Sequence, residues 1–173
     1  MSKKQKDDRH GAAKSGSESE LRLRAIVKKH GFQLLRIQKD FDEAGLKILG
    51  RNKFKKPEWW PEQCKKTRKK GSESFFNADG FINVGDGVII ELKNSNKHGT
   101  TDEKVIYDLE KIRDGVYGKD HKLIYAFVGK VCQDIGPYRL FELKAKMEDL
   151  PVQTVFGWDE LEKVIESLKD GAL

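Results

Sequence analysis

Hydrophobic side chains recur at regular spacings along most of the chain after residue 16. Leu23, Ile26 and Val27 fall on one helical face, and Gly31 would end that helix because glycine readily adopts the left-handed conformation found after many helices. Further helices are predicted at about 100–114, at 138–148 and from Asp159 onward. Runs rich in β-branched and aromatic residues predict strands at 32–37, 74–84, 88–95, 122–129 and 152–156.

The predicted order of elements is therefore α-β-β-β-α-β-α-β-α. Alternating strands and helices of this kind predict an α/β fold with a mixed central sheet flanked by helices. The segment 40–51 is compatible with a short helix or with an extended loop.

The strands at 74–84 and 88–95 form a predicted hairpin around residues 85–87. If these three residues make the loop, Asp79 lies opposite Lys93 and Phe81 lies opposite Glu91. Because side chains alternate between the two faces of a strand, Asp79, Glu91 and Lys93 would then share one face of the hairpin. A shift of the pairing by one residue would separate them, so the prediction depends on the length of the loop.

Glu91 and Lys93 are charged residues inside an otherwise apolar strand, where burial is costly unless the charges are paired or bound to a metal. Asp79 and Glu91 offer oxygen ligands that suit Mg²⁺, which keeps several waters and binds substrate phosphate oxygens. Lys93 could position a metal-bound water, help to deprotonate it, and offset the charge that develops on the phosphate. The alternative interpretation is a structural salt-bridge cluster on the strand.

Asp79, followed across a hairpin by Glu91-Leu92-Lys93 and framed by helices, resembles the PD-(D/E)XK nuclease superfamily. The resemblance covers roughly residues 17–129 and departs from the usual pattern at Ala78, where many members have proline. It implies a restriction-endonuclease-like core of order αβββαβ that hydrolyses DNA with Mg²⁺, for which Mn²⁺ is expected to substitute. It also implies that Asp79 and Glu91 bind the metal and that all three of Asp79, Glu91 and Lys93 are catalytic.

Some members of the superfamily carry a further glutamate on the first helix, beside the metal. Glu20 lies at the matching place, although it could equally serve as the fourth residue of a helix-capping box that begins at Ser17. A second Glu-x-Lys motif, Glu142-Leu143-Lys144, lies in a predicted helix with no Asp-bearing strand before it. We therefore interpret the second motif as a chance match.

The chain has 173 residues and a net charge of +6. Its length fits one domain, so we expect a disordered basic tail at 1–16 and a single nuclease domain at 17–173. Residues 51–70 hold nine Lys and Arg residues against two Glu, whereas the part after residue 70 is acidic. A concentrated basic segment on an acidic body indicates a polyanion partner.

This basic segment belongs to a predicted insertion at about 51–71, where two nearby prolines argue against regular structure. Its tryptophans beside Lys and Arg suit base stacking and phosphate contact, or they anchor the insertion to the core. The predicted DNA-binding residues are Lys53, Lys55, Lys56, Trp59, Trp60, Lys65, Lys66, Arg68, Lys69 and Lys70, together with Lys104 in the helix at 100–114.

Double-stranded DNA is the expected partner, cut by a sequence-specific endonuclease of the restriction or homing type. A structure-specific nuclease similar to Holliday-junction resolvases is the second possibility, and a non-catalytic nucleic-acid-binding module is the third. Cutting both strands of a duplex takes two active sites, so a homodimer is expected. We expect a cytoplasmic protein without membrane contact, because the chain lacks a signal-peptide pattern, a long apolar stretch and a disulfide framework.

Overall fold

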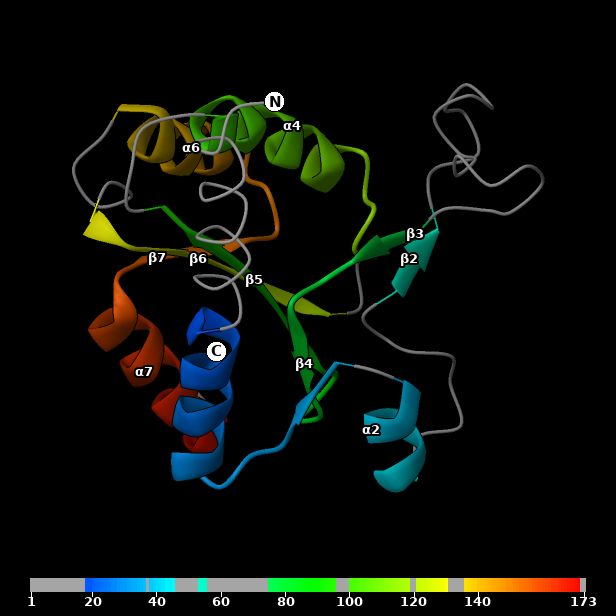
Figure 1. The fold of residues 1–173 in the computed structure, drawn as a ribbon. Coiled ribbons are helices and arrows are strands. Elements are labelled where there is room, and N and C mark those ends of the chain that lie inside the picture. Colours follow the sequence, from blue (N-terminus) through cyan, green and yellow to red (C-terminus); the bar gives the residue numbers. More distant parts are fainter. Residues whose placement is uncertain are drawn as a thin grey trace, which may run out of the picture.

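The computed structural model describes residues 18–36, 38–45, 53–55, 75–95, 100–118, 121–130 and 136–171. The predicted tail at 1–16 and most of the predicted insertion at 51–71 lie outside these residues. Within them, helices cover both faces of a mixed central sheet (Figure 1). The predicted α/β fold class is thus confirmed. None of the helices in the described ranges is long and apolar enough to cross a membrane.

The chain begins its described part with a helix at 18–29, which ends as predicted at Gly31, in the left-handed conformation with φ +84°. The elements that follow are β1 (Leu34–Leu35), α2 (Gln38–Glu43), β2 (Lys53–Lys55), β3 (Phe75–Asn77), β4 (Gly80–Ile82), β5 (Val88–Asn94), α4 (Thr100–Arg113), β6 (Lys122–Val128), α6 (Gly136–Met147), β7 (Gln153–Phe156), α7 (Trp158–Ser167) and a short 3-10 helix (Leu168–Asp170).

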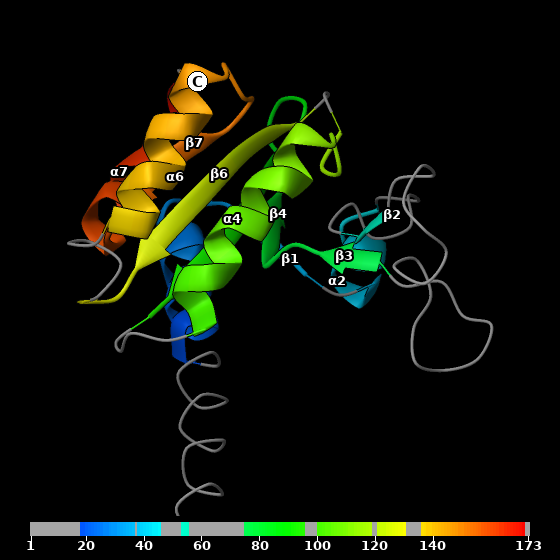
Figure 2. The same cartoon turned by 90° about the horizontal axis from the view of Figure 1, so that it is seen from above.

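The central sheet has the strand order β1-β4-β5-β6-β7. Strand β4 runs antiparallel to β1 and β5, whereas β5, β6 and β7 are parallel. The helix at 18–29 and α7 cover one face of the sheet, and α4 and α6 cover the other (Figures 1 and 2). Because both faces of β5 and β6 are covered, these strands read as continuous apolar runs rather than alternating ones.

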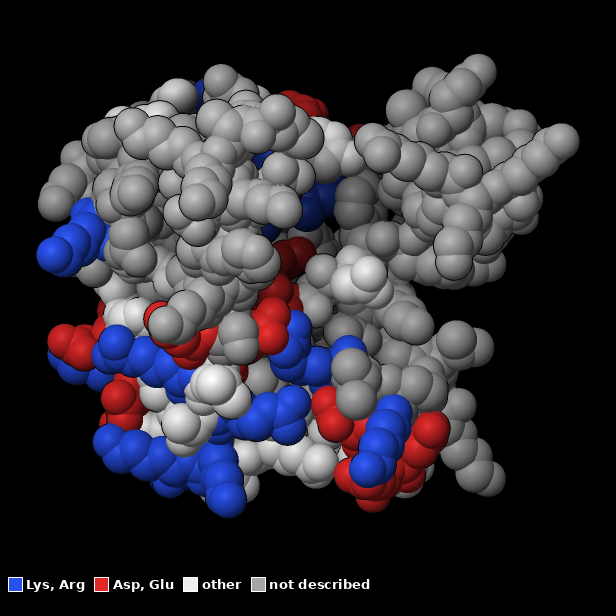
Figure 3. Space-filling model, in the orientation of Figure 1, with Lys and Arg blue, Asp and Glu red and all other residues white. Residues whose placement is uncertain are grey.

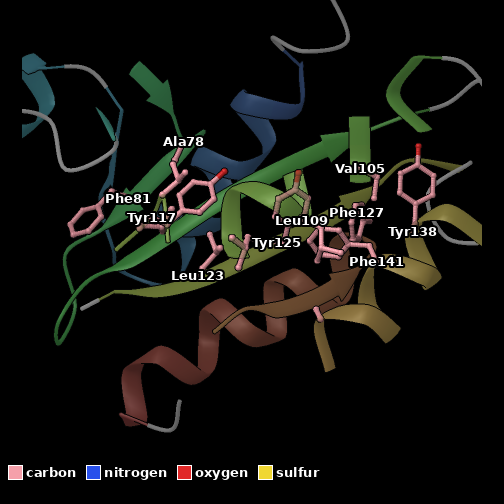
Figure 4. Close-up of a cluster of buried hydrophobic side chains, with 14 of the residues drawn as sticks. Ala78, Phe81, Val105, Leu109, Tyr117, Leu123, Tyr125, Phe127, Tyr138 and Phe141 are labelled. Carbon is pink, nitrogen blue, oxygen red and sulfur yellow. The ribbon is translucent and has the colours of Figure 1, made fainter. Parts of the chain in front are cut away.

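Two apolar cores fill the space on either side of the sheet. On the α4 and α6 side, aromatic rings dominate: Tyr125 lies 4.8 Å from Phe141 and Phe127 lies 5.1 Å from Tyr138, measured between ring centroids (Figure 4). The opposite core is built from aliphatic side chains of the helix at 18–29, α7 and the alternate strand positions. Glu91, on the α4 side of β5, is therefore buried beside an aromatic core.

The predicted strand at 74–84 is interrupted in the structure. Ala78 and Asp79 separate β3 from β4, and the two strands belong to different sheets. Strand β3 pairs instead with β2, with Lys55 opposite Phe75. The predicted insertion therefore begins with a strand rather than a loop, and the intervening segment 56–74 starts and ends at paired strands.

The predicted pairing of the hairpin is wrong by two residues. Phe81 lies opposite Ile89 and Ile82 opposite Val88, so the loop spans the five residues 83–87 instead of three. Phe81 is consequently not opposite Glu91, nor is Asp79 opposite Lys93. A shift of two residues keeps the side chains of β4 and β5 on their predicted faces, so Glu91 and Lys93 still share one face, whereas Asp79 lies in the break before β4.

Gly87 closes this loop in a conformation with φ +99°, which L side chains rarely adopt. A Cβ atom added there would lie 2.4 Å from Cζ of Phe81. The Phe81 ring is fully buried, lies 6.0 Å from the Phe41 ring, and meets the His121 ring edge-on at 5.6 Å. It therefore has little room to move away.

We predict that Gly87→Ala lowers the free energy of unfolding by about 2–4 kcal/mol, since backbone strain and a steric clash act together. Gly85→Ala is the matched control: Gly85 also has a positive φ, +54°, but no atom within 4 Å of the added Cβ. Its loss should be about 1 kcal/mol. Urea unfolding followed by circular dichroism measures both, and equal losses would show that the Phe81 contact is not a constraint.

Candidate active site

Asp79 lies at the break between β3 and β4 and is held from two directions. Its Oδ2 accepts a hydrogen bond of 2.7 Å from the backbone N–H of Leu92 on β5. Its carbonyl oxygen accepts a hydrogen bond of 2.6 Å from Nε of Arg36. Among the described residues, no hydrogen bond reaches Asp79 Oδ1. The carboxylate is thus fixed in place with one oxygen left for another partner.

Glu91 is the buried member of the candidate site, with 4% of its surface exposed. Its Oε1 accepts a hydrogen bond of 2.6 Å from the Tyr117 hydroxyl, and its Oε2 lies 4.0 Å from Nζ of Lys93. Burial raises the pKa of Glu91 to about 7, and Asp79 adds to the rise, while Lys93 and Lys111 oppose it. The ionised form of this carboxyl group is therefore under-compensated near neutral pH.

Lys93 points to the same face as Glu91 but is closer to another acid. Its Nζ lies 3.2 Å from Oδ2 of Asp108 on α4 and 5.6 Å from the centre of the Tyr125 ring. Burial acts to lower the pKa of Lys93, but Glu91, Asp108 and Asp79 outweigh burial and raise it. Lys93 therefore stays protonated at neutral pH.

Three polar residues that the sequence-based reasoning missed complete the cluster on α4 and β6. Asp108 Oδ1 lies 2.6 Å from Nζ of Lys111, and Asp108 Oδ2 accepts a 2.5 Å hydrogen bond from the Tyr125 hydroxyl. Burial acts to raise the pKa of Asp108, but Lys93 and Lys111 outweigh it, so the pKa is lowered and Asp108 is ionised. A signal was available: Asp108 interrupts the apolar stripe that Val105, Leu109 and Ile112 form on α4.

Tyr117 reaches Glu91 because α4 ends in a tight turn. The N–H of Val116 donates to the carbonyl of Lys111, and the N–H of Gly115 donates to the carbonyl of Ile112, both at 3.0 Å. Gly115 has φ +66°, as this type of helix end requires. Burial raises the pKa of the Tyr117 hydroxyl, so Tyr117 remains a hydrogen-bond donor to Glu91.

The described cluster contains one negative charge more than its lysines balance. Asp79, Glu91 and Asp108 supply three carboxyl groups, whereas Lys93 and Lys111 supply two ammonium groups. An uncompensated buried charge is costly, and protonation of Glu91 is one way to remove it. A bound cation is the other.

The donor set suits a cation that needs few protein ligands. Among the described residues, no group of three or more His, Cys, Asp or Glu side chains is placed to hold one metal ion. Among the carboxylate oxygens of Asp79, Glu91 and Asp108, only Asp79 Oδ1 and Glu91 Oε2 are reached by no hydrogen bond from the described residues. Two hard oxygen donors, with waters and phosphate oxygens as further ligands, fit Mg²⁺.

Glu20 lies beside the site but is engaged elsewhere. Its Oε2 is 2.6 Å from Nη1 of Arg36, the same arginine that binds the Asp79 carbonyl. This ion pair occupies one oxygen of Glu20 and competes with any role of Glu20 at a metal. The capping box proposed for it begins at Ser17, which lies outside the described residues.

Most of the predicted DNA-binding residues lie outside the residues that the structure describes. Lys104 is exposed on α4, and Lys53 and Lys55 are described only as backbone in β2. Figure 3 shows acidic side chains gathered over α2 and basic ones over the helix at 18–29, so both charges occur on this face. The other predicted DNA contacts lie outside the described residues: Lys56, Trp59, Trp60, Lys65, Lys66, Arg68, Lys69 and Lys70.

The pairing of β2 with β3 nevertheless fixes where the basic segment joins the fold. Lys55 lies opposite Phe75, so the residues that flank 56–74 are side by side. Asn77 precedes Asp79 by two residues. The most basic part of the sequence is thus attached directly beside the acidic cluster.

The second Glu-x-Lys motif has a different environment. It lies in α6, as predicted, where Glu142 pairs with Arg139 at 3.2 Å and with Lys146 at 2.7 Å.

Comparison of the chain with protein-family models, curated proteins and solved structures found no match.

We predict that burial of Glu91 makes the stability of the metal-free protein fall as pH rises from about 4.5 to about 7. In this range the folded protein keeps a proton that the unfolded chain has released. The resulting loss in the free energy of unfolding is at most about 3 kcal/mol. Glu91→Gln cannot ionise but still accepts from Tyr117, so it should lack this fall and be more stable than the wild type at pH 8.

Urea unfolding in EDTA at pH 5 and pH 8 measures the effect. Glu142→Gln, which alters a surface ion pair on α6, is the control and should retain the wild-type dependence on pH. If Glu91→Gln shows the same fall in stability as the wild type, the raised pKa is refuted.

Proposed function

We propose that this chain is a metal-dependent endonuclease that hydrolyses phosphodiester bonds of double-stranded DNA. The observation that carries the proposal is the proximity of Asp79 to Glu91 and Lys93 on β5, where the charge of Asp79 acts to raise the pKa of both side chains. The order of helix 18–29, β1, β4, β5, α4 and β6, with α2, β2 and β3 inserted, is compatible with the αβββαβ core of restriction-endonuclease-like enzymes.

Asp79 and Glu91 would hold the metal ion, Mg²⁺ or Mn²⁺ in its place. The bound ion supplies polarisation of a phosphate oxygen and a lower pKa for a coordinated water. Ionised Glu91 is required for this, and a divalent cation favours that form by offsetting the burial that otherwise keeps it protonated.

Lys93 acts in this proposal as a cation. Its raised pKa argues against a role as general base at neutral pH. The ammonium group orients the attacking water and stabilises the negative charge that grows on the phosphate oxygens. The water oxygen forms a bond to phosphorus and releases a proton to solvent, while the phosphorus bond to the leaving oxygen breaks and that oxygen takes up a proton from solvent.

The basic segment 51–70 would hold the DNA, because it joins the fold beside Asp79 and carries a net charge of +7. Cleavage of both strands requires two sites, so the proposal includes a homodimer. The substrate separates the nuclease classes: a preferred duplex sequence indicates a restriction or homing type, and a preference for four-way junctions indicates a resolvase type.

We predict that the protein nicks supercoiled plasmid in Mg²⁺ but not in EDTA. Asp79→Asn and Lys93→Gln should each reduce the rate by at least about 100-fold, since Asp79 would hold the metal ion and Lys93 would stabilise the charge on the reacting phosphate. Asp79→Asn keeps an acceptor for the Leu92 N–H, which guards the fold. Agarose gels give the rates.

The matched controls are Glu142→Gln and Lys144→Gln in the second Glu-x-Lys motif, and both should cleave at the wild-type rate. Wild-type nicking by Asp79→Asn or Lys93→Gln would refute the site assignment. Binding of plasmid, junction and duplex RNA without cleavage of any of them would favour the non-catalytic binding module.

We further predict a steep loss of DNA affinity with salt. Replacing Lys65, Lys66, Lys69 and Lys70 by glutamine should reduce the slope of log K against log salt by up to about 4, if each lysine neutralises one phosphate. Fluorescence anisotropy in EDTA, at KCl concentrations from about 50 to 200 mM, measures the slope.

The control variant has the same change in net charge. It replaces four exposed lysines outside the basic segment by glutamine: Lys28, Lys146, Lys163 and Lys169. Its slope should stay close to that of the wild type. Equal changes in the two variants would mean that total charge, rather than the basic segment, governs binding.

A further inference from the structure

Two lysines of the candidate site lie between the same two carboxylates. Lys93 Nζ is 3.2 Å from Asp108 but 4.0 Å from Glu91, and Lys111 Nζ is 2.6 Å from Asp108 but 3.9 Å from Glu91. The four groups close a ring of alternating charge, and both ammonium groups lie nearer to Asp108.

Each carboxylate also has its own tyrosine. Tyr125 donates to Asp108 and Tyr117 donates to Glu91, so the hydroxyl groups do not explain why both lysines favour Asp108. Within the ring, the two acids differ chiefly in their distances from the two ammonium groups. Asp108 is close to both lysines, whereas no hydrogen bond among the described residues reaches Glu91 Oε2.

We propose that Asp108 is a positioning residue: it holds Lys93 and Lys111 on α4's side of the ring and so keeps Glu91 Oε2 available to a divalent cation. This inference rests on the proposed metal-dependent function. Asp108 itself need not contact metal or DNA.

The physical reason is competition between ammonium groups and metal for the same oxygens. An ammonium group in a dry site moves toward the acid that offers the better ion pair. Without the charge of Asp108, Lys93 and Lys111 would pair with Glu91 instead. Each Nζ atom would need to move about 1 Å closer to a Glu91 carboxylate oxygen to reach the usual length of a charge-assisted hydrogen bond. The cation would then have to displace them.

Mn²⁺ titrated alone into the protein, followed by calorimetry without DNA, tests this directly. Asp108→Asn should weaken Mn²⁺ binding by about 10-fold or more, within the range known for groups that orient metal ligands. Lys111→Met removes a competing ammonium group and should bind Mn²⁺ at least as tightly as the wild type. In the double variant, the loss caused by Asp108→Asn should be several-fold smaller than in the wild-type background.

The double variant separates positioning from simple loss of charge. If Asp108 acted only through long-range attraction, its effect would be the same with and without Lys111, and the two changes would be additive. Glu110→Gln on the same helix is the charge-matched control, since Glu110 is exposed and pairs with Arg113; it should leave Mn²⁺ affinity unchanged.

Wild-type affinity in Asp108→Asn, or an equal loss in both backgrounds, would overturn the inference while leaving the metal-dependent function intact. If Asp108→Asn does not fold, Lys111→Met decides, because weaker Mn²⁺ binding by that variant also overturns it. Absence of Mn²⁺ binding by the wild-type protein would refute the metal-dependent function itself, and this inference with it.

Discussion

Burial of the Glu91 carboxyl group beneath α4 is the constraint on which the rest of the site depends. Strand β5 is covered on both faces, so the face that carries Glu91 cannot be wetted by water as an edge strand would be. The carboxyl group must therefore find its partners within the protein. Tyr117, Lys93 and Lys111 supply them. Because the two lysines also face Asp79 and Asp108, ionised Glu91 leaves one negative charge that a proton or a cation can balance.

Helix α4 contributes both to the aromatic core and to the charged cluster. Its apolar stripe seals the aromatic core, and Asp108 and Lys111 bring charge into the same stripe, where the strand already holds Glu91 and Lys93. The site and the core are therefore not separable parts of this fold. A change that moves α4 against the sheet would alter the packing of the core and the distances between the charges together.

Sequence patterns predicted the elements around the site because 88–95, 100–114 and 122–129 are strongly periodic or continuously apolar. They did not predict the break at Ala78 and Asp79, since local composition is equally strand-like on both sides and only the pairing partners differ. The hairpin register was wrong because loop length cannot be read from glycines alone. The pairing of Asp108 with Lys93 and that of Arg36 with Asp79 were missed because these partners are distant in sequence, and only the packed fold brings them together.

The unequal distances within the ring bear on whether the cluster is structural or functional. A cluster selected only for stability would gain most by placing its ammonium groups close to every buried carboxylate, since buried polar groups are normally satisfied. Here both lysines approach Asp108, and Glu91 keeps an unbonded oxygen and a raised pKa within the described part of the chain. An unbonded buried oxygen and a raised carboxyl pKa are typical of sites that a ligand completes. In the proposed function, that ligand would be a cation, and the basic segment 51–70 would draw a phosphate to it.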